Sequence, residues 1–248
     1  MNNSTVSSNP DLSVVIPTYN EGGNIIPLIN TIIETTSSLK TEIIVVDDSS
    51  PDGTARIVRE YASRFPQIKV SIRDRKMGLA GAVFLGTNIA SADNVCVIDA
   101  DTSHDPKEIP EMFALLQNGF DLVIGSRFVQ GGSLGSQPFL RKIISVVINE
   151  ICRRLFNIKS KDVLTGFVLC QRSAITEMPT RFSTNGFKFL LEILATQKNL
   201  SVCEWPIVFQ KRFDGKSKAS LFEVFELSKL CIRLFLHNLV RGTRRPSL

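Results

Sequence analysis

Apolar residues fall in short uninterrupted runs, which alternate with longer segments where apolar positions recur three or four residues apart. The first pattern predicts buried strands and the second predicts helices. The runs are 12-LSVVIPTYN-20, 42-EIIVVDD-48, 68-IKVSI-72, 94-NVCVID-99 and 120-FDLVIGSRF-128. The predicted helices cover 24–39, 54 to about 65, 79–89 and 106–117. This alternation predicts an α/β fold with a mainly parallel sheet, covered by helices on both faces.

The second half of the chain predicts two long apolar helices, over 138–157 and 221–242. An irregular segment, a shorter helix and a strand are expected between them, at 162–172, 186–197 and 202–212. The C-terminal helix carries one polar stripe, which predicts an amphipathic helix. The stripe consists of Glu223, Glu226, Lys229, Arg233, His237 and Arg241.

The simplest domain division follows from these elements. We expect a disordered segment over 1–10, one α/β domain over 11–220, and an amphipathic helix with a basic tail over 221–248. The first ten residues are polar and do not form a secretory signal. No apolar run is long enough to span a bilayer, so we expect a soluble or peripheral protein.

Polar residues gather where the predicted strands end. The four clusters are Thr18–Glu21, Asp47–Asp48, Asp99–Asp101 and Ser126–Arg127. In open parallel sheets, ligands bind beyond the carboxyl ends of the strands. We therefore expect these clusters to converge on one edge and to form a binding site there.

Asp99 and Asp101 are two residues apart at the end of a strand, so their carboxylates share a face and repel each other. A bound cation would relieve this repulsion. Carboxylate oxygens suit Mg²⁺ or Mn²⁺, and Mg²⁺ completes its shell with water and substrate phosphates. The other interpretation is an acidic turn before the helix that starts at Asp105-Pro106. The D-x-D pattern alone leaves both open.

Charge and the remaining residue types narrow the choice of partner. The net charge of +5 favours an anionic partner, but nucleic acid, a phosphorylated substrate and an acidic membrane all satisfy it. No basic motif interleaved with aromatic residues supports nucleic acid binding.

The five cysteines are scattered and odd in number, as in a reducing compartment. No G-x-G-x-x-G follows an early strand, which argues against NAD.

Several charged residues have both a purely structural and a functional interpretation. Asp52-Gly53 is typical of a turn, whereas Asp47-Asp48 could bind a ribose or a base edge. Arg127, Arg212 and Lys218 lie in predicted loops. Basic residues in loops are usually solvated surface charges, but beside a metal site they would complete a cage for phosphates.

Six segments together resemble a known family. They are 16-IPTYNE-21, 45-VVDDSSPDGT-54, 77-MGLAGA-82, 98-IDADTSHDP-106, 125-GSRF-128 and 212-RFDGKSK-218. In this order and spacing they resemble the dolichol-phosphate mannose synthases, a group within the inverting family 2 glycosyltransferases of GT-A fold. The similarity runs from about Leu12 to Lys218, so it is more specific than any single motif.

The resemblance implies roles for individual residues. The nucleotide of GDP-mannose would be held by Pro17, Tyr19, Glu21, Val46 and Asp48. The metal and the diphosphate would lie against Asp99, Ala100 and Asp101, and the phosphates of donor or acceptor would meet Arg127, Arg212 and Lys218. Some members have glutamine as a further metal ligand where this chain has Ser103. The segment 162-DVLTGFVLCQR-172 matches the family's D-x-[TS]-SGF stretch only loosely.

The implied acceptor, a polyprenyl or dolichyl phosphate, is largely dianionic at neutral pH and needs no general base. Hydroxyl-accepting relatives carry an acidic pair where this chain reads 182-FSTNGFKF-189. The alternatives are another donor such as UDP-glucose, a hydroxyl acceptor, or a catalytically idle regulatory relative.

The resemblance implies association with the cytoplasmic face of a membrane, of the endoplasmic reticulum in a eukaryote or the plasma membrane in a prokaryote, and the two long helices could provide the contact. They would lie on lipid, or instead pack on the sheet or on small membrane subunits.

Overall fold

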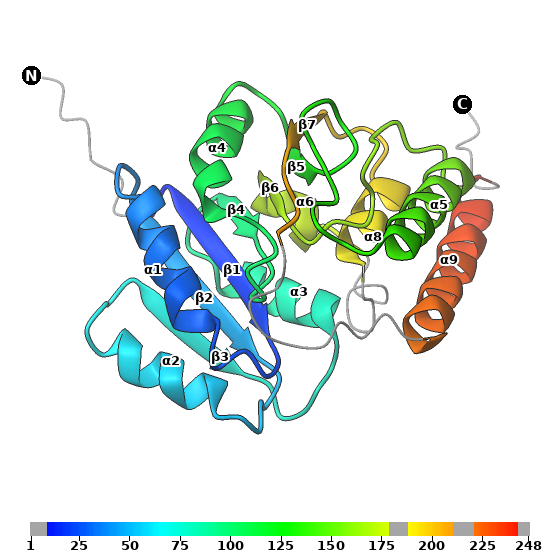
Figure 1. Ribbon diagram of the computed structural model, residues 1–248. Helices are drawn as coiled ribbons and strands as arrows, with labels where there is room; N and C mark the ends of the chain where they lie inside the picture. Colours follow the sequence, from blue (N-terminus) through cyan, green and yellow to red (C-terminus); the bar gives the residue numbers. More distant parts are fainter. Residues whose placement is uncertain (1–8, 179–187, 211–220, 243–248) are drawn as a thin grey trace, which may run out of the picture.

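A computed structural model describes residues 9–178, 188–210 and 221–242. Its centre is a seven-stranded sheet with the strand order β3-β2-β1-β4-β6-β5-β7 (Figure 1). The strands are β1 (Leu12–Thr18), β2 (Thr41–Asp47), β3 (Ile68–Ile72), β4 (Asn94–Val97), β5 (Leu122–Ser126), β6 (Val168–Gln171) and β7 (Val202–Pro206). Each of the five predicted apolar runs coincides with a strand, and the strands end up to two residues before the run does.

The sheet is mainly parallel, as predicted, with one reversed strand. β6 is antiparallel to both β4 and β5, while the other pairs are parallel. β6 lies inside 162–172, which we expected to be irregular. Because β6 runs backwards, its first residue lies at the edge where β4 and β5 end. The segment that precedes β6 therefore reaches the edge with the polar clusters.

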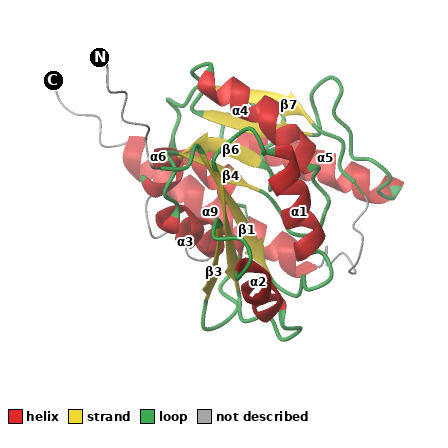
Figure 2. Ribbon diagram, turned by 90° about the vertical axis from the view of Figure 1, so that its left-hand side faces the viewer, coloured by secondary structure: helices red, strands yellow, loops and turns green. Residues whose placement is uncertain are grey.

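Helices cover both faces of the sheet (Figures 1 and 2). They are α1 (Ile25–Thr35), α2 (Thr54–Ala62), α3 (Leu79–Ile89), η1 (Pro106–Glu108), α4 (Ile109–Gln117), α5 (Phe139–Leu155), α6 (Arg172–Thr176), α8 (Phe189–Thr196) and α9 (Leu221–Gly242). One core cluster joins the sheet to α1, α2 and α4, and the other joins it to α3, α6 and α8. This arrangement confirms the predicted fold class.

The long helices α5 and α9 lie side by side beyond α8 (Figure 1). One cysteine from each helix is in contact with the other, with 3.9 Å between the Sγ atoms of Cys152 and Cys231. Apolar side chains on both helices are exposed, most of all Phe139 at 79% and Leu140 at 68%. None of the described helices is long and apolar enough to cross a membrane.

The C-terminal helix is present, as predicted, and its amphipathic character stays a prediction. His237, a member of the stripe, is buried, whereas Phe225, Ile232 and Phe235 are exposed. Packing against α8 explains this, because the helix turns Leu234 and His237 inward. The domain division at 1–10, 11–220 and 221–248 stays a prediction.

Candidate functional site at the carboxyl edge of the sheet

Strained backbone marks the edge where the polar clusters gather. Asn20, Ser49 and Thr102 have φ angles of 62°, 52° and 61° and follow β1, β2 and β4 in turn. Positive φ is uncommon outside glycine, and for a β-branched residue such as Thr102 it is unfavourable. Strain of this kind persists where the surrounding structure enforces it, often at functional sites. Three loops at one edge therefore share a positive φ angle, a backbone strain often found at functional sites.

Asp99 and Asp101 lie together in the loop after β4. The side chain of Asp99 is 29% exposed, whereas Asp101 is nearly buried and accepts a hydrogen bond from the Ser103 amide at 3.1 Å. The main chain of Gly166 lies against Asp99, so closely that a β-carbon on this glycine would overlap the carboxylate. The two carboxylates thus occupy a confined place that opens to solvent at Asp99.

The side chain of His104 lies next to Asp99. Its Nε2 lies 3.4 Å from Asp99 Oδ2, and its ring is buried between the rings of Phe167 and Phe209, each 5.4 Å away between centroids. The ring of His104 thus packs on two aromatic side chains, and its Nε2 lies close to the more exposed of the two carboxylates.

The residues around this loop fit a small, hard cation. Two carboxylates are what Mg²⁺ usually takes from a protein, the rest of its shell being water and substrate phosphate. Ser103 is buried, and its Oγ has no hydrogen-bond partner among the described residues, so a polar atom remains to be satisfied here. Within the same residues, no group of three or more His, Cys, Asp or Glu side chains could hold a metal. A metal here would rely on Asp99, Asp101 and its substrate.

The acidic pair after β2 is already paired within the protein. Asp48 is buried and forms an ion pair with Arg73, and its Oδ2 accepts a hydrogen bond from the Met77 amide at 3.1 Å. Asp47 accepts hydrogen bonds from the hydroxyls of Thr18 at 2.9 Å and Ser50 at 2.6 Å. Asp48 therefore holds the loop after β3 in place. Its expected contact with the nucleotide stays a prediction.

The other residues expected to hold the nucleotide surround this pair. Pro17 and Val46 are buried neighbours in the register of β1 and β2, so only their backbone borders the edge. The ring of Tyr19 lies 4.0 Å from the Nζ of Lys76. Glu21 accepts a hydrogen bond from the Asn24 side chain at 2.8 Å. Ala100, between the two metal aspartates, is buried.

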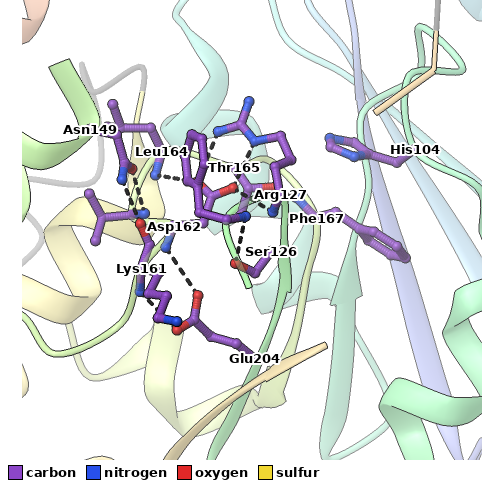
Figure 3. Close-up of polar contacts among 12 residues, drawn as sticks. His104, Ser126, Arg127, Asn149, Lys161, Asp162, Leu164, Thr165, Phe167 and Glu204 are labelled. Carbon is purple, nitrogen blue, oxygen red and sulfur yellow. Dashed lines mark hydrogen bonds and ion pairs between the residues drawn. The ribbon is translucent and has the colours of Figure 1, made fainter. Parts of the chain in front are cut away.

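Arg127 is a paired residue whose side chain is only 9% exposed, rather than a solvated surface charge. Its Nε and Nη2 donate to the two oxygens of Asp162, at 2.7 and 2.8 Å, and its backbone amide donates to the same carboxylate at 3.1 Å (Figure 3). Asp162 is fully buried. The expected phosphate contact of Arg127 stays a prediction, and Arg212 and Lys218 lie outside the described residues.

Several residues of the site were not identified from the sequence. Asp162 and Gly166 lie in the stretch that matched the family loosely, and their partners Arg127 and Asp99 are distant in sequence. Arg73 opens a loop that carried no recognised motif. The available sequence signal for His104 is its place in 98-IDADTSHDP-106, three residues after Asp101.

Comparison with known proteins gives one family. Residues 13–178 match the model of glycosyl transferase family 2. A dolichol-phosphate mannosyltransferase of Pyrococcus furiosus is 38% identical over 90% of this chain, which spans 63% of that protein's length. A polyprenol monophosphomannose synthase of Mycolicibacterium smegmatis is 32% identical over 84% of this chain and 80% of its own.

Solved structures agree with this fold. The glucosyl-3-phosphoglycerate synthase of Mycobacterium tuberculosis, solved with Mn²⁺, UDP-glucose and phosphoglyceric acid, superposes with a TM-score of 0.66. The superposition covers 92% of this chain and 79% of that one, at 20% identity. At this identity the likeness shows the fold alone.

Proposed function

The chain belongs to glycosyltransferase family 2, and from this premise we propose that it transfers mannose from GDP-mannose to a polyprenyl phosphate such as dolichyl phosphate, with inversion. One observation carries the proposal. Two relatives named for this kind of transfer align with 90% and 84% of this chain, well beyond the family domain itself. The site at the carboxyl edge supports it, because the arrangement suits a diphosphate.

The proposed chemistry is a single displacement. An oxygen of the polyprenyl phosphate attacks the anomeric carbon, the bond from that carbon to the diphosphate breaks, and GDP leaves with the electron pair. The acceptor phosphate is already largely dianionic at neutral pH, so no side chain has to remove a proton. The protein's contribution is then to place the two substrates and to stabilise the leaving group.

Each part of the edge has a role in this proposal. The nucleotide would lie along Pro17, Tyr19, Glu21, Val46 and Asp48. A Mg²⁺ or Mn²⁺ ion, held by Asp99 and Asp101, would neutralise the charge that develops on the diphosphate. Arg127, Arg212 and Lys218 would meet the phosphates of donor and acceptor. Ser103 would complete the loop around the ion through its unsatisfied hydroxyl.

The acceptor also requires contact with a lipid surface. The exposed apolar side chains of α5 and α9, with Arg141, Lys142 and Lys229 beside them, suit the interface of a membrane with anionic headgroups. We propose a peripheral association at the cytoplasmic face, alone or through small membrane subunits.

A donor panel tests the proposal. Purified protein with Mn²⁺ and a short polyprenyl phosphate is incubated with GDP-mannose, UDP-glucose or UDP-GlcNAc, with and without EDTA, and the glycolipid is measured. Transfer from GDP-mannose alone, lost with EDTA, is the expected result. Transfer from a UDP-sugar only would replace the donor, and no transfer even with added membranes would favour a missing partner subunit or an idle relative.

A further inference from the structure

The strap, residues 161–167, is an irregular segment between α5 and β6 that lies at the carboxyl edge. It lies there because β6 is antiparallel, so that the chain enters this strand from the edge of the site. Near its start the strap contacts Arg127, and near its end it contacts Asp99. The strap thus connects the two parts of the site that the proposed reaction uses.

Side chains from two other elements hold the start of the strap. The carboxylate of Glu204, in β7, accepts hydrogen bonds from the amides of Lys161 at 2.8 Å and Asp162 at 3.0 Å. Asn149, in α5, donates from Nδ2 to the Lys161 carbonyl at 2.5 Å and accepts from the Val163 amide at 2.9 Å. Figure 3 shows these contacts around the strap. Asn149 therefore bonds the backbone on both sides of Asp162.

Asp162, held in this way, fixes the guanidinium of Arg127. Both of its oxygens accept from Arg127, and Oδ1 also accepts from the Leu164 amide at 3.3 Å. The geometry of this pair is bidentate, so the plane of the guanidinium follows the position of the carboxylate. A shift of the backbone around Asp162 would turn Arg127.

A packing role does not account for an asparagine at this point of α5. Asparagine is unfavourable within a helix, and its amide is costly to bury unless both polar atoms are bonded. Asn149 is 4% exposed, and both atoms bond the strap. An apolar residue would fill the same space without these requirements, but it would leave the Lys161 carbonyl and the Val163 amide without this partner.

We propose that Asn149 is a positioning residue for transfer: by fixing the strap on both sides of Asp162, it sets Arg127 relative to Asp99 without touching a substrate. The inference rests on the proposed function, since it concerns the rate of that reaction. It adds a residue of the surface helix α5 to the machinery, at a distance from the aspartates and from the strand ends.

Two readouts test Asn149→Ala, with Asn88→Ala as the matched control. Asn88 is an exposed asparagine of α3 that donates to the Phe84 carbonyl within its own helix, at 2.9 Å. Amide hydrogen exchange in peptides covering the strap should speed up in Asn149→Ala and not in the control. The kcat should fall roughly tenfold to 10²-fold, as for a small displacement of a substrate-positioning group, while the KM for GDP-mannose stays within about twofold.

A double-mutant cycle separates positioning from a general loss of stability. If Asn149 acts through Asp162, the variant Asn149→Ala/Asp162→Asn should have the kcat of Asp162→Asn within about twofold. Independent effects that multiply would overturn the proposal. If Asn149→Ala does not fold, Asn149→Asp, which keeps the size and the acceptor for Val163, takes its place.

The outcomes distinguish this inference from the proposed function. Wild-type protein that transfers mannose, with an Asn149→Ala variant of unchanged kcat, overturns the role of Asn149 and leaves the function standing. Wild-type protein that transfers no mannose overturns both. Faster exchange in the strap together with reduced kcat and unchanged KM supports the proposal.

Discussion

Gly166 and Asp99 are in direct contact, the glycine's main chain lying where any side chain would overlap the carboxylate. Gly166→Ala should therefore displace Asp99, weaken Mn²⁺ binding and lower transfer by on the order of 10²-fold. Calorimetric titration of Mn²⁺ and transfer assays measure the two effects. Gly23→Ala is the matched control, because a β-carbon at Gly23 meets nothing within 4 Å. Equal Mn²⁺ affinity in both variants would contradict the prediction.

Asp101→Asn should abolish transfer and leave the fold intact, because it removes a metal ligand charge while keeping the shape of the side chain. Circular dichroism and thermal unfolding check the fold, and glycolipid formation checks activity. Asp93→Asn makes the same change at a side chain that is 96% exposed and should be fully active. An active Asp101→Asn variant would refute the metal site.

Glu192 should make the protein less stable as the pH rises. It is buried in α8, and desolvation raises the pKa of its carboxyl from 4.5 to about 8, against the opposing charge of Arg233. The folded state thus keeps a proton that the unfolded chain has lost. The contribution of Glu192 to stability is fully present below pH 4.5 and is lost as the pH rises toward 8, by up to about 1.4 kcal/mol per pH unit.

Denaturant unfolding of the wild type and of Glu192→Gln, at several pH values between 5 and 9, measures this dependence. The glutamine variant cannot ionise, so its stability should change less over this range. Parallel pH profiles for the two proteins would show that Glu192 does not carry the effect.

The buried pair of Arg127 and Asp162 should matter far more for stability than the exposed pairs of α5. Asp162→Ala leaves the guanidinium buried without its carboxylate, which typically costs about 3–5 kcal/mol. Glu150→Ala removes the partly exposed partner of Arg153 and Arg154 at the protein surface, and surface pairs of this kind contribute little. Urea unfolding of both variants gives the comparison, and similar losses would be unexpected.

The exposed end of α5 should contribute to membrane binding. Replacing Phe139 and Leu140 together by serine removes the two most exposed apolar side chains of the helix. We expect weaker co-sedimentation with vesicles that contain anionic lipid, because less apolar area enters the interface. Ile72→Ser is the control, since Ile72 lies in the edge strand β3 at the far end of the sheet. Equal loss in the control would point to instability instead.

The sequence predicted the fold well because continuous apolar runs and helical spacing are local signals. The strands 68–72 and 94–97 and the helix 79–89 lie within or at the predicted limits. β6 was not predicted, since its neighbours in 162–172 mix polar residues and glycine.

The sequence located the site residues at the ends of strands, but it did not indicate which side chains form pairs with one another. Arg127 and Asp162 are 35 positions apart, and Asp48 and Arg73 are 25 apart. Nothing local marks such pairs, because they depend on which strands become neighbours. The role of Asn149 could not be predicted for the same reason, because its hydrogen-bond partners lie beyond the end of its own helix.

The reversed strand also has a consequence for the order in which the protein forms during synthesis. The strands β3, β2, β1 and β4 are adjacent in the sheet and all precede residue 98, so they can assemble while the rest is still being translated. β4, however, receives its second neighbour only when Val168–Gln171 has left the ribosome. At roughly 5–20 residues per second, its edge stays open for several seconds. An open strand edge readily pairs with other chains, so fragments that end before β6 should be prone to aggregate.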